Sequence, residues 1–346
     1  MISLGGRKIS GIRYGSTSVK EVRVGNRLVW SPEANFVAVG QNGRVMYSPD
    51  GCSWYSGAAG TANLMSVCYG NGRFVAVGED GAYATSTDGK TWTVGSKGSG
   101  VWNRVCYGNG NFVAVGCTSK EYFEGMGVIM YSPDGISWTV KNTSTGDTWR
   151  TWYDVCFGDG KFAAVGMRHV DYTSRSDEFP RAAYSTSLTT WQERDVSLDT
   201  TSFTSIVYDG AKFVAACCGY DEKASKDFTA VVSSTNVTSW KILASLQVES
   251  QSGSKMCFGK SQGGIYAFVN GSLNYTTSTD ASTWHDHSVN GVPIPRTSFV
   301  RGICHGKGRL VAVGNILAVS GIGEDALTYV GDACGSVLND VCFKEV

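Results

Sequence analysis

No apolar run in this 346-residue sequence approaches the roughly 20 residues that a transmembrane helix needs. Neither sign of charge is in excess, because 30 Lys and Arg offset 30 Asp and Glu. The sequence therefore lacks a basic stripe of the kind that contacts phosphates. No segment shows the 3.6-residue period of an amphipathic helix. We expect a protein that neither inserts into a membrane nor binds nucleic acid, and that contains no helical repeats.

Residues suited to catalysis or metal binding are also scarce. The sequence has 4 His and no Cys-x-x-Cys pair, which removes the strongest zinc signal. His285 and His287 flank Asp286 and could share one face of a strand, but no third metal ligand lies nearby in the sequence. We therefore predict no catalytic residue, no metal and no cofactor.

One short apolar segment recurs along the chain at intervals of 38 to 53 residues. Such intervals match the length of a propeller blade of four strands. The segment is apolar at every position, so we expect each copy to be covered on both faces by neighbouring units. Its copies are FVAVG at 36–40, 74–78 and 112–116, FAAVG at 162–166, FVAAC at 213–217, YAFVN at 266–270 and LVAVG at 310–314.

Residues 65–94 give the pattern of one complete unit. Four short segments, MSVCY, RFVAVG, AYATS and KTWTV, are predicted as antiparallel strands a, b, c and d. Asn71-Gly72 and Asp88-Gly89 are typical of the tight turns between such strands. Four short antiparallel strands per unit, repeated around a ring, predict an all-β, seven-bladed β-propeller.

The two ends of the chain each carry half of one blade. The last strand a copy, VCF at 341–343, has no strand b after it, while the first strand b at Phe36 has no strand a before it. We expect the C-terminal strand, residues 338–343, to complete the blade begun by residues 35–56 and to close the ring. This predicts a propeller over residues 32–346, preceded by a separate segment, residues 1–31.

The turns between strands c and d carry a second repeated string, as in SPDGCSW at 48–54, STDGKTW at 86–92 and SPDGISW at 132–138. The string resembles the Asp-box of sialidase-like and sortilin-like propellers, although it is one residue shorter. We expect its Ser and Asp to accept hydrogen bonds from backbone N–H groups of the turn. Its large flat Trp rings are expected to fill the gaps between adjacent blades. These are Trp54, Trp92, Trp138, Trp191, Trp240 and Trp284.

Strand a repeats two further features. A cysteine recurs at one position, so we interpret these residues as buried free thiols of a protein made in a reducing cytoplasm. They are Cys68, Cys106, Cys156, Cys257, Cys304 and Cys342. His305 stands where other copies have Tyr or Phe, and is expected to be a packed ring. Polar residues recur two positions before the cysteine position, which is Val207 in the fifth blade, and predict ion pairs near the channel mouth, not the arginine cluster of a sialidase. They are Ser66, Arg104, Asp154, Ser205, Lys255 and Asp340.

Three consecutive blades carry insertions between strands b and c, at 117–127, 167–181 and 218–229. Loops on a rigid scaffold are where binding is concentrated, and aromatic and Arg side chains are the usual anchors. Mere tolerance of extra residues is the alternative explanation. Trp149, in the connection before the fourth blade, has no counterpart in the other units. The candidate residues for binding a partner or receptor are Tyr122, Phe123, Trp149, Arg168, Tyr172, Arg175, Phe179, Tyr220 and Phe228.

Residues 1–31 differ from the repeat. They are predicted as three short strands, 8–14, 19–24 and 27–30, joined by turns. A segment of about 30 residues buries too little apolar area to fold alone. We therefore expect it to dock on a partner, on the propeller or on copies of itself.

The string YGSTSVKEVRVGNRLVW resembles short N-terminal modules of bacteriophage tail and other virion proteins. The repeat GNGRFVAVG followed by YSxDGxxW is similar to propellers of phage structural proteins and of bacterial surface proteins. This resemblance implies a non-enzymatic virion component, tail-associated or receptor-binding, that attaches to other virion proteins through residues 1–31. Its partner on the other side would be a host-surface glycan or protein. The alternatives are a lectin-like or adhesive bacterial propeller and, third, a sialidase-like glycan hydrolase.

Overall fold

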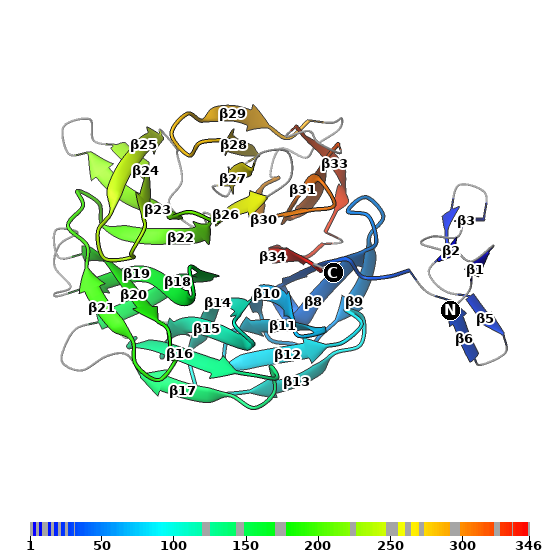
Figure 1. The fold of residues 1–346 in the computed structure, drawn as a ribbon. Helices are drawn as coiled ribbons and strands as arrows, with labels where there is room; N and C mark the ends of the chain where they lie inside the picture. Colours follow the sequence, from blue (N-terminus) through cyan, green and yellow to red (C-terminus); the bar gives the residue numbers. More distant parts are fainter. Residues whose placement is uncertain are drawn as a thin grey trace.

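The structure is a computed structural model, and most of the propeller is described in it. The described residues are 3–4, 7–8, 13–14, 17–19, 22–24, 27–30, 32–119, 125–142, 149–169, 178–221, 226–246, 255–259, 264–269, 273–290, 298–321, 326–333 and 335–344. Seven antiparallel sheets of four strands each form a ring (Figure 1). The predicted all-β, seven-bladed β-propeller is therefore confirmed.

Each blade consists of strands a to d, from the centre outward. Blade 1 has β34 (Leu338–Phe343), β7 (Phe36–Gly40), β8 (Arg44–Ser48) and β9 (Tyr55–Ala58), with the short 3-10 turn Gln41–Gly43 between β7 and β8. Blade 2 has β10 (Leu64–Gly70), β11 (Arg73–Gly78), β12 (Ala82–Ser86) and β13 (Thr93–Ser96). Blade 3 has β14 (Val101–Gly108), β15 (Asn111–Cys117), β16 (Gly127–Ser132) and β17 (Thr139–Asn142). Blade 4 has β18 (Trp149–Gly158), β19 (Lys161–His169), β20 (Glu178–Ser185) and β21 (Gln192–Asp195).

The remaining three blades follow the same order. Blade 5 has β22 (Ser202–Tyr208), β23 (Phe213–Asp221), β24 (Lys226–Ser234) and β25 (Lys241–Leu246). Blade 6 has β26 (Lys255–Gly259), β27 (Ile265–Val269), β28 (Asn274–Ser278) and β29 (His285–Ser288). Blade 7 has β30 (Val300–Gly306), β31 (Arg309–Gly314), β32 (Ile316–Ser320) and β33 (Leu327–Asp332).

The two ends of the propeller meet in blade 1, as the sequence predicts. Strand β34 pairs antiparallel with β7, so that Val341 lies opposite Ala38 and Phe343 opposite Phe36. The Lys344 N–H donates to the Asn35 carbonyl at 2.7 Å. Because the C-terminal strand supplies the innermost strand of the first blade, the ring closes without leaving that sheet edge open.

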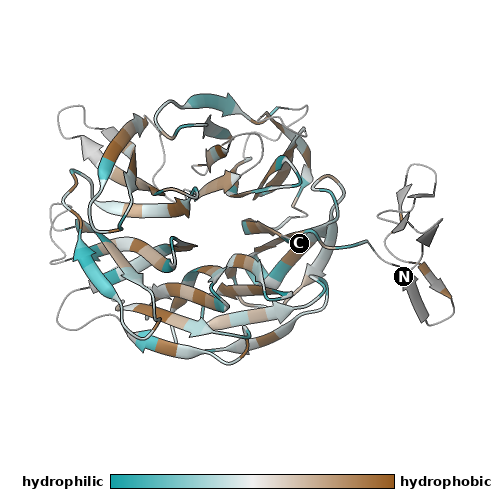
Figure 2. Cartoon of the chain, in the orientation of Figure 1, coloured by the Kyte–Doolittle hydropathy of each residue, from teal (hydrophilic) through white to brown (hydrophobic). Residues whose placement is uncertain are grey.

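The core consists of seven apolar clusters, one between each pair of neighbouring blades. Strand b contributes to two of them, since alternate residues of β7 pack toward blade 7 (Phe36, Ala38) and toward blade 2 (Val37, Val39). All four of these side chains are fully buried. The hydropathy colouring shows the same division, with apolar inner strands and hydrophilic outer strands β21 and β29 (Figure 2).

The glycine of the repeated strand b is required by a close approach of the backbone. A Cβ added to Gly78 would lie 2.0 Å from the Asn63 carbonyl oxygen, and one added to Gly116 would lie 1.9 Å from that of Val101. Any side chain here would push strand a away from strand b. Glycine therefore recurs at this position because the backbone at the start of strand a passes too close to strand b to leave room for a side chain.

The turns between strands c and d have the hydrogen bonds that the sequence predicts. In the first, Ser48 Oγ accepts from the Gly51 N–H at 2.8 Å, and Asp50 Oδ1 accepts from the N–H groups of Cys52 and Ser53 at 2.9 and 2.7 Å. The Trp54 indole N–H donates to the Gly51 carbonyl. Each of the six Trp rings packs into the cluster shared with the preceding blade. These repeated residues therefore stabilise the turns and the blade interfaces.

The N-terminal segment has the strands expected at 19–24 and 27–30, as β5 (Val22–Val24) and β6 (Arg27–Trp30), but not the single strand expected at 8–14. Its described residues form three separate two-stranded hairpins: β1 (Ser3–Leu4) with β2 (Arg7–Lys8), β3 (Arg13–Tyr14) with β4 (Thr17–Ser18), and β5 with β6. None of these strands pairs with the propeller. Val24 is 69% exposed, and an isolated hairpin is marginally stable in water, so this segment has apolar surface for a partner to cover.

The ring has two different faces. We call the face with the a–b and c–d hairpins the short-loop face, and the face with the b–c and d–a connections the elaborated face. Strand b begins and strand a ends at the short-loop face, so the chain enters the ring before Phe36 and leaves it after Phe343 on that side. The insertions of blades 3 to 5 lie on the opposite side. No described segment forms a helix long and apolar enough to cross a membrane.

The strand a cysteines are reduced and pack at blade interfaces. Cys68 packs against the cluster between blades 2 and 3, and Cys106 against the next one. Every cysteine in the described part of the chain is a free thiol; of the six strand a cysteines Cys304 is buried and the other five are half-buried. Burial raises the pKa of Cys257 to about 12. By contrast, Cys52 is exposed, and Cys334 lies outside the described residues.

We expect the thiols of the folded protein to react slowly once Cys52 and Cys334 are replaced by serine. At pH 8 a thiol with a pKa of about 12 is ionised to only about one part in 10⁴, compared with about a quarter for a free cysteine. Labelling of Cys257 with a thiol reagent should therefore slow by on the order of 1000-fold, and labelling of all these thiols should become rapid in denaturant. A disulfide between any two of Cys68, Cys106 and Cys156 in mass spectrometry would contradict this interpretation.

Candidate functional site

Two of the three insertions are strand-paired hairpins, not irregular loops. In blade 4 the pairing of β19 with β20 continues to His169 opposite Glu178, and in blade 5 that of β23 with β24 continues to Asp221 opposite Lys226. The sequence-based bounds therefore included residues that belong to the strands. In blade 3 the pairing continues only as far as the Thr118 N–H, which donates to the Met126 carbonyl at 3.0 Å. Paired backbone groups make the hairpins rigid supports for side chains.

The predicted binding residues fall into three groups. Arg168, Phe179 and Phe228 have described side chains, and the first two lie directly opposite each other in blade 4. Trp149 and Tyr220 lie in described strands, but their side chains are outside the description. The others, Tyr122, Phe123, Tyr172 and Arg175, lie outside the described residues.

Phe228 has a packing role in blade 5. It lies opposite Gly219, and a Cβ added to that glycine would meet the Phe228 ring at 2.3 Å. The half-buried ring also packs against the cluster between blades 4 and 5. Phe228 therefore covers a glycine in the neighbouring strand and supports the hairpin.

One face of blade 4 gathers charged residues from all four strands. Arg150 lies opposite Arg168 in the register of β18 and β19, and Arg181 lies opposite Asp195 in that of β20 and β21. Glu193, two residues before Asp195, shares its face because side chains alternate along a strand. The deeper residues of this face, Ala164 and Ala183, pack toward blade 3. The charged group is therefore the upper part of the blade 4 surface that faces blade 3.

The three arginines on this face share two carboxylates. Arg150 Nη1 and Arg181 Nη2 lie 3.1 and 2.8 Å from Glu193 Oε2. Asp195 pairs with Arg181 and, at 3.0 Å, with Arg168 Nη2. Burial and then repulsion from Arg181 lower the pKa of Arg150. The described residues of this face therefore carry one more positive than negative group.

The outer end of this face is accessible. The guanidinium of Arg168 lies over the Phe179 ring, 5.1 Å from its centroid, and Phe179 is 37% exposed. Arg168 Nε is buried but has no hydrogen-bond acceptor. The Arg150 N–H donates to the Gly125 carbonyl, so the blade 3 insertion lies alongside. Sequence analysis found Arg168 and Phe179 but missed Glu193 and Asp195, whose only signal is two acidic residues at strand spacing in an otherwise ordinary outer strand.

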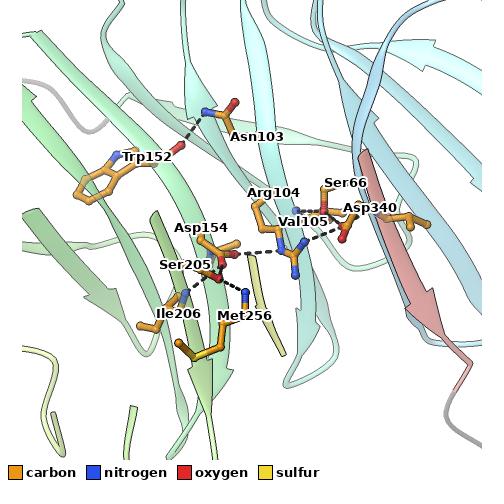
Figure 3. A network of polar contacts seen from close by, with 12 residues as sticks. Ser66, Asn103, Arg104, Val105, Trp152, Asp154, Ser205, Ile206, Met256 and Asp340 are labelled. Atoms are coloured by element: carbon orange, nitrogen blue, oxygen red, sulfur yellow. Dashed lines mark hydrogen bonds and ion pairs between the residues drawn. The ribbon is translucent and has the colours of Figure 1, made fainter. Parts of the chain in front are cut away.

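The centre of the ring contains a second polar group, shown in Figure 3. Arg104 of blade 3 pairs with Asp154 of blade 4 at 3.0 Å and with Asp340 of blade 1 at 2.7 Å. Both aspartates are 1% exposed. Although burial opposes it, the attraction of Asp340 and Asp154 raises the pKa of Arg104. The predicted ion pairs of the strand a positions are therefore present.

Hydrogen bonds extend this group from blade to blade (Figure 3). Asp340 accepts from Ser66 Oγ and from the Val67 N–H, while Ser66 Oγ accepts from the Val105 N–H in blade 3. Asp154 and Ser205 repeat the arrangement toward blades 5 and 6, where the Ile206 and Met256 N–H groups donate. Most polar atoms of this group bond neighbouring strands to one another, although the buried Asp340 Oδ1 has no hydrogen-bond partner, and we interpret the central group as structural.

The histidines show no catalytic arrangement in the described part of the chain. His287 stacks on Tyr275 and its Nε2 lies 2.8 Å from Thr277 Oγ1, while His285 is exposed. The His305 ring lies where a Cβ of Gly259 would be, and burial lowers its pKa, which confirms the packed ring. Among the described residues no three His, Cys, Asp or Glu side chains are grouped to hold a metal ion.

Comparison with known proteins supports the fold. Neither a family model nor a curated protein matches the sequence. Among solved structures, YCF48 bound to D1 peptide is 15% identical, with a TM-score of 0.52 over 81% of this chain and 89% of that one. The WD40 β-propeller domain of Doa1 is 12% identical, with a TM-score of 0.51 over 87% of both chains. YCF48 from Cyanidioschyzon merolae is 14% identical, with a TM-score of 0.50 over 89% and 90%. At these identities the similarity establishes a shared β-propeller fold.

Proposed function

We propose that the protein is a non-enzymatic bacteriophage virion component, tail-associated or receptor-binding, which attaches through residues 1–31 and presents its elaborated face to a partner or host surface. The observation that carries this proposal is the opposite placement of the two features. The N-terminal segment joins the ring at the short-loop face, whereas the paired hairpins of blades 4 and 5 extend from the other face. A protein anchored by its N-terminal segment would thus have its insertions free for recognition.

A lectin-like or adhesive bacterial propeller is the second candidate. The accessible Arg168 and Phe179 suit it equally well, because the recognition face would be the same. The two candidates differ in the role of residues 1–31, which only the virion proposal requires for assembly. A hydrolase is not proposed, since in the two polar groups, at the ring centre and on blade 4, the arginines pair with the carboxylates.

Two deletions are expected to have opposite effects. The first replaces residues 117–127, 167–180 and 218–229 with Glu-Asp-Gly, the connection that blade 2 uses between Gly78 and Ala82. Particles carrying this variant should assemble but adsorb at least tenfold less to host cells, because the recognition surface is lost. The second removes residues 1–31 and should leave a folded propeller that is missing from particles. Immunoblots of purified particles and adsorption assays measure the two effects.

Cooperative thermal unfolding of both variants is the necessary control, because Met167, Cys218 and Thr229 are buried. If a folded loop-shortened variant adsorbs normally, the elaborated face is not the recognition site. Normal incorporation of the N-terminal deletion would exclude residues 1–31 as the anchor and favour the adhesive alternative.

A further inference from the structure

We infer that the charged face of blade 4 binds an acidic glycan, with a sugar carboxylate or sulfate on Arg168 and a sugar ring against Phe179. The inference rests on the proposed function, since it names the ligand class of the same recognition surface. Arg168 and Phe179 form one pair across β19 and β20, and Asp195 follows at the end of β21. Cation, aromatic ring and carboxylate therefore lie next to one another on one sheet surface.

The first argument is charge. On this face Arg150, Arg168 and Arg181 are opposed only by Glu193 and Asp195 among the described residues. Repulsion among the three guanidinium groups contributes to the lowered pKa of Arg150. The other side of the blade has His169 paired with Glu178 at 3.5 Å, so that carboxylate does not offset the excess. Arg168, which shares Asp195 with Arg181, is the arginine at the outer end of this face that an incoming anion would contact.

The second argument is the free hydrogen-bonding capacity of Arg168. Its Nη2 contacts Asp195, but its buried Nε has no acceptor. A buried donor without an acceptor is costly, and a planar carboxylate or sulfate is the partner that a guanidinium edge fits best. Asp195 keeps its pair with Arg181 if Arg168 turns toward a ligand. Arg168 can therefore bind an anion without leaving a carboxylate unpaired.

The third argument favours a sugar over an acidic peptide. Phe179 leaves 37% of its surface exposed, which offers a flat apolar surface to the C–H groups of a sugar ring. The Asp195 side chain is 45% exposed beside it and can accept hydrogen bonds from sugar hydroxyls. A run of Asp or Glu side chains would instead be repelled by Asp195. One acidic group, hydroxyl donors and an apolar face together describe an acidic sugar.

The test measures binding of the full chain to matched pairs of carbohydrates by calorimetry. Oligogalacturonate is compared with its methyl ester for the carboxylate, and dextran sulfate with dextran for the sulfate. We expect at least one acidic member to bind at least tenfold more tightly than its neutral form. Arg168→Gln should weaken that binding about tenfold or more, the usual effect of losing a charge-assisted hydrogen bond. Phe179→Ala should weaken it as well.

Arg194→Gln is the matched control. Arg194 is exposed in the same strand as Glu193 and Asp195, but it alternates onto the other face of the blade. The substitution Arg194→Gln removes the same charge as Arg168→Gln but from the other face, so it should change the affinity less than twofold. If Arg168→Gln and Arg194→Gln lose the same affinity for the acidic carbohydrate, the binding is general electrostatic attraction and the inference is overturned. Equal binding of polyglutamate, insensitive to Phe179→Ala, would point to a peptide ligand instead.

The outcomes separate this inference from the proposed function. If none of the acidic carbohydrates binds while loop shortening still abolishes adsorption, the ligand class is wrong and the recognition face stands. If an acidic carbohydrate binds through Arg168 while loop-shortened particles adsorb normally, the glycan site stands and the proposed recognition role falls.

Discussion

Deleting residues 337–346 is expected to abolish cooperative unfolding of the propeller. The deletion removes β34, whose Leu338 and Val341 are buried between blades, and leaves one side of β7 unpaired. Burial of each such side chain contributes about 1.5–3 kcal/mol, before the lost strand hydrogen bonds are counted. Typical domains are stable by only about 5–15 kcal/mol, so the ring should open and aggregate. Calorimetry and size-exclusion chromatography would measure this.

Truncation after Lys344 is the control for this deletion. It keeps all of β34 and the hydrogen bond from the Lys344 N–H to Asn35, so it should unfold like the full chain. A monomeric protein with a single sharp transition after the larger deletion would show that blade 1 does not need its C-terminal strand.

Replacing Arg104 with Met should destabilise the protein by about 3–5 kcal/mol, the usual cost of removing one partner from a buried ion pair. Asp154 and Asp340 are both 1% exposed and would each lose their cationic partner. Denaturant unfolding should show a lower midpoint with a similar slope. Adding Asp154→Asn and Asp340→Asn to this variant should recover part of the loss, because amides cost less to bury than unpaired carboxylates.

Lys255→Met is the matched control for Arg104. Lys255 occupies the equivalent position in blade 6, but no ion pair is formed by it among the described residues. Burial and then repulsion from Arg104 lower its pKa, so its charge is less favoured than that of Arg104. A loss as large as that of Arg104→Met would mean that overall charge balance, not the direct pairs, stabilises the centre.

The repeat explains why so much of the fold could be predicted. Strand order, blade number, ring closure, the Ser and Asp turns and the Trp positions all follow from copies of one unit, because each copy must bury the same side chains. The N-terminal segment has no second copy with which its predicted strands could be compared. The turns between β1 and β2 and between β2 and β3 were therefore not predicted. The strands predicted at 19–24 and 27–30 match the third hairpin, β5 with β6, but the single strand predicted at 8–14 spans parts of the other two hairpins.

Sequence analysis predicted only some residues of the candidate site. Arg168 and Phe179 stand out because they interrupt the repeat, but Arg150, Glu193 and Asp195 lie in strands that look ordinary. Their grouping depends on the register across four strands separated by connections of different length. Register between distant segments cannot be counted along the chain, because each connection adds an unknown offset.

By itself the sequence determined the periodic part of this protein: seven blades, their strand types, the strand that closes the ring and the residues repeated at each blade interface. Those features depend on local period and on identical neighbours. Only the tertiary structure decided which charges meet, as in Arg104 with Asp340 and in Arg168 with Asp195. The reason is geometric, since ring closure brings together residues more than 200 positions apart whose contacts leave no local pattern.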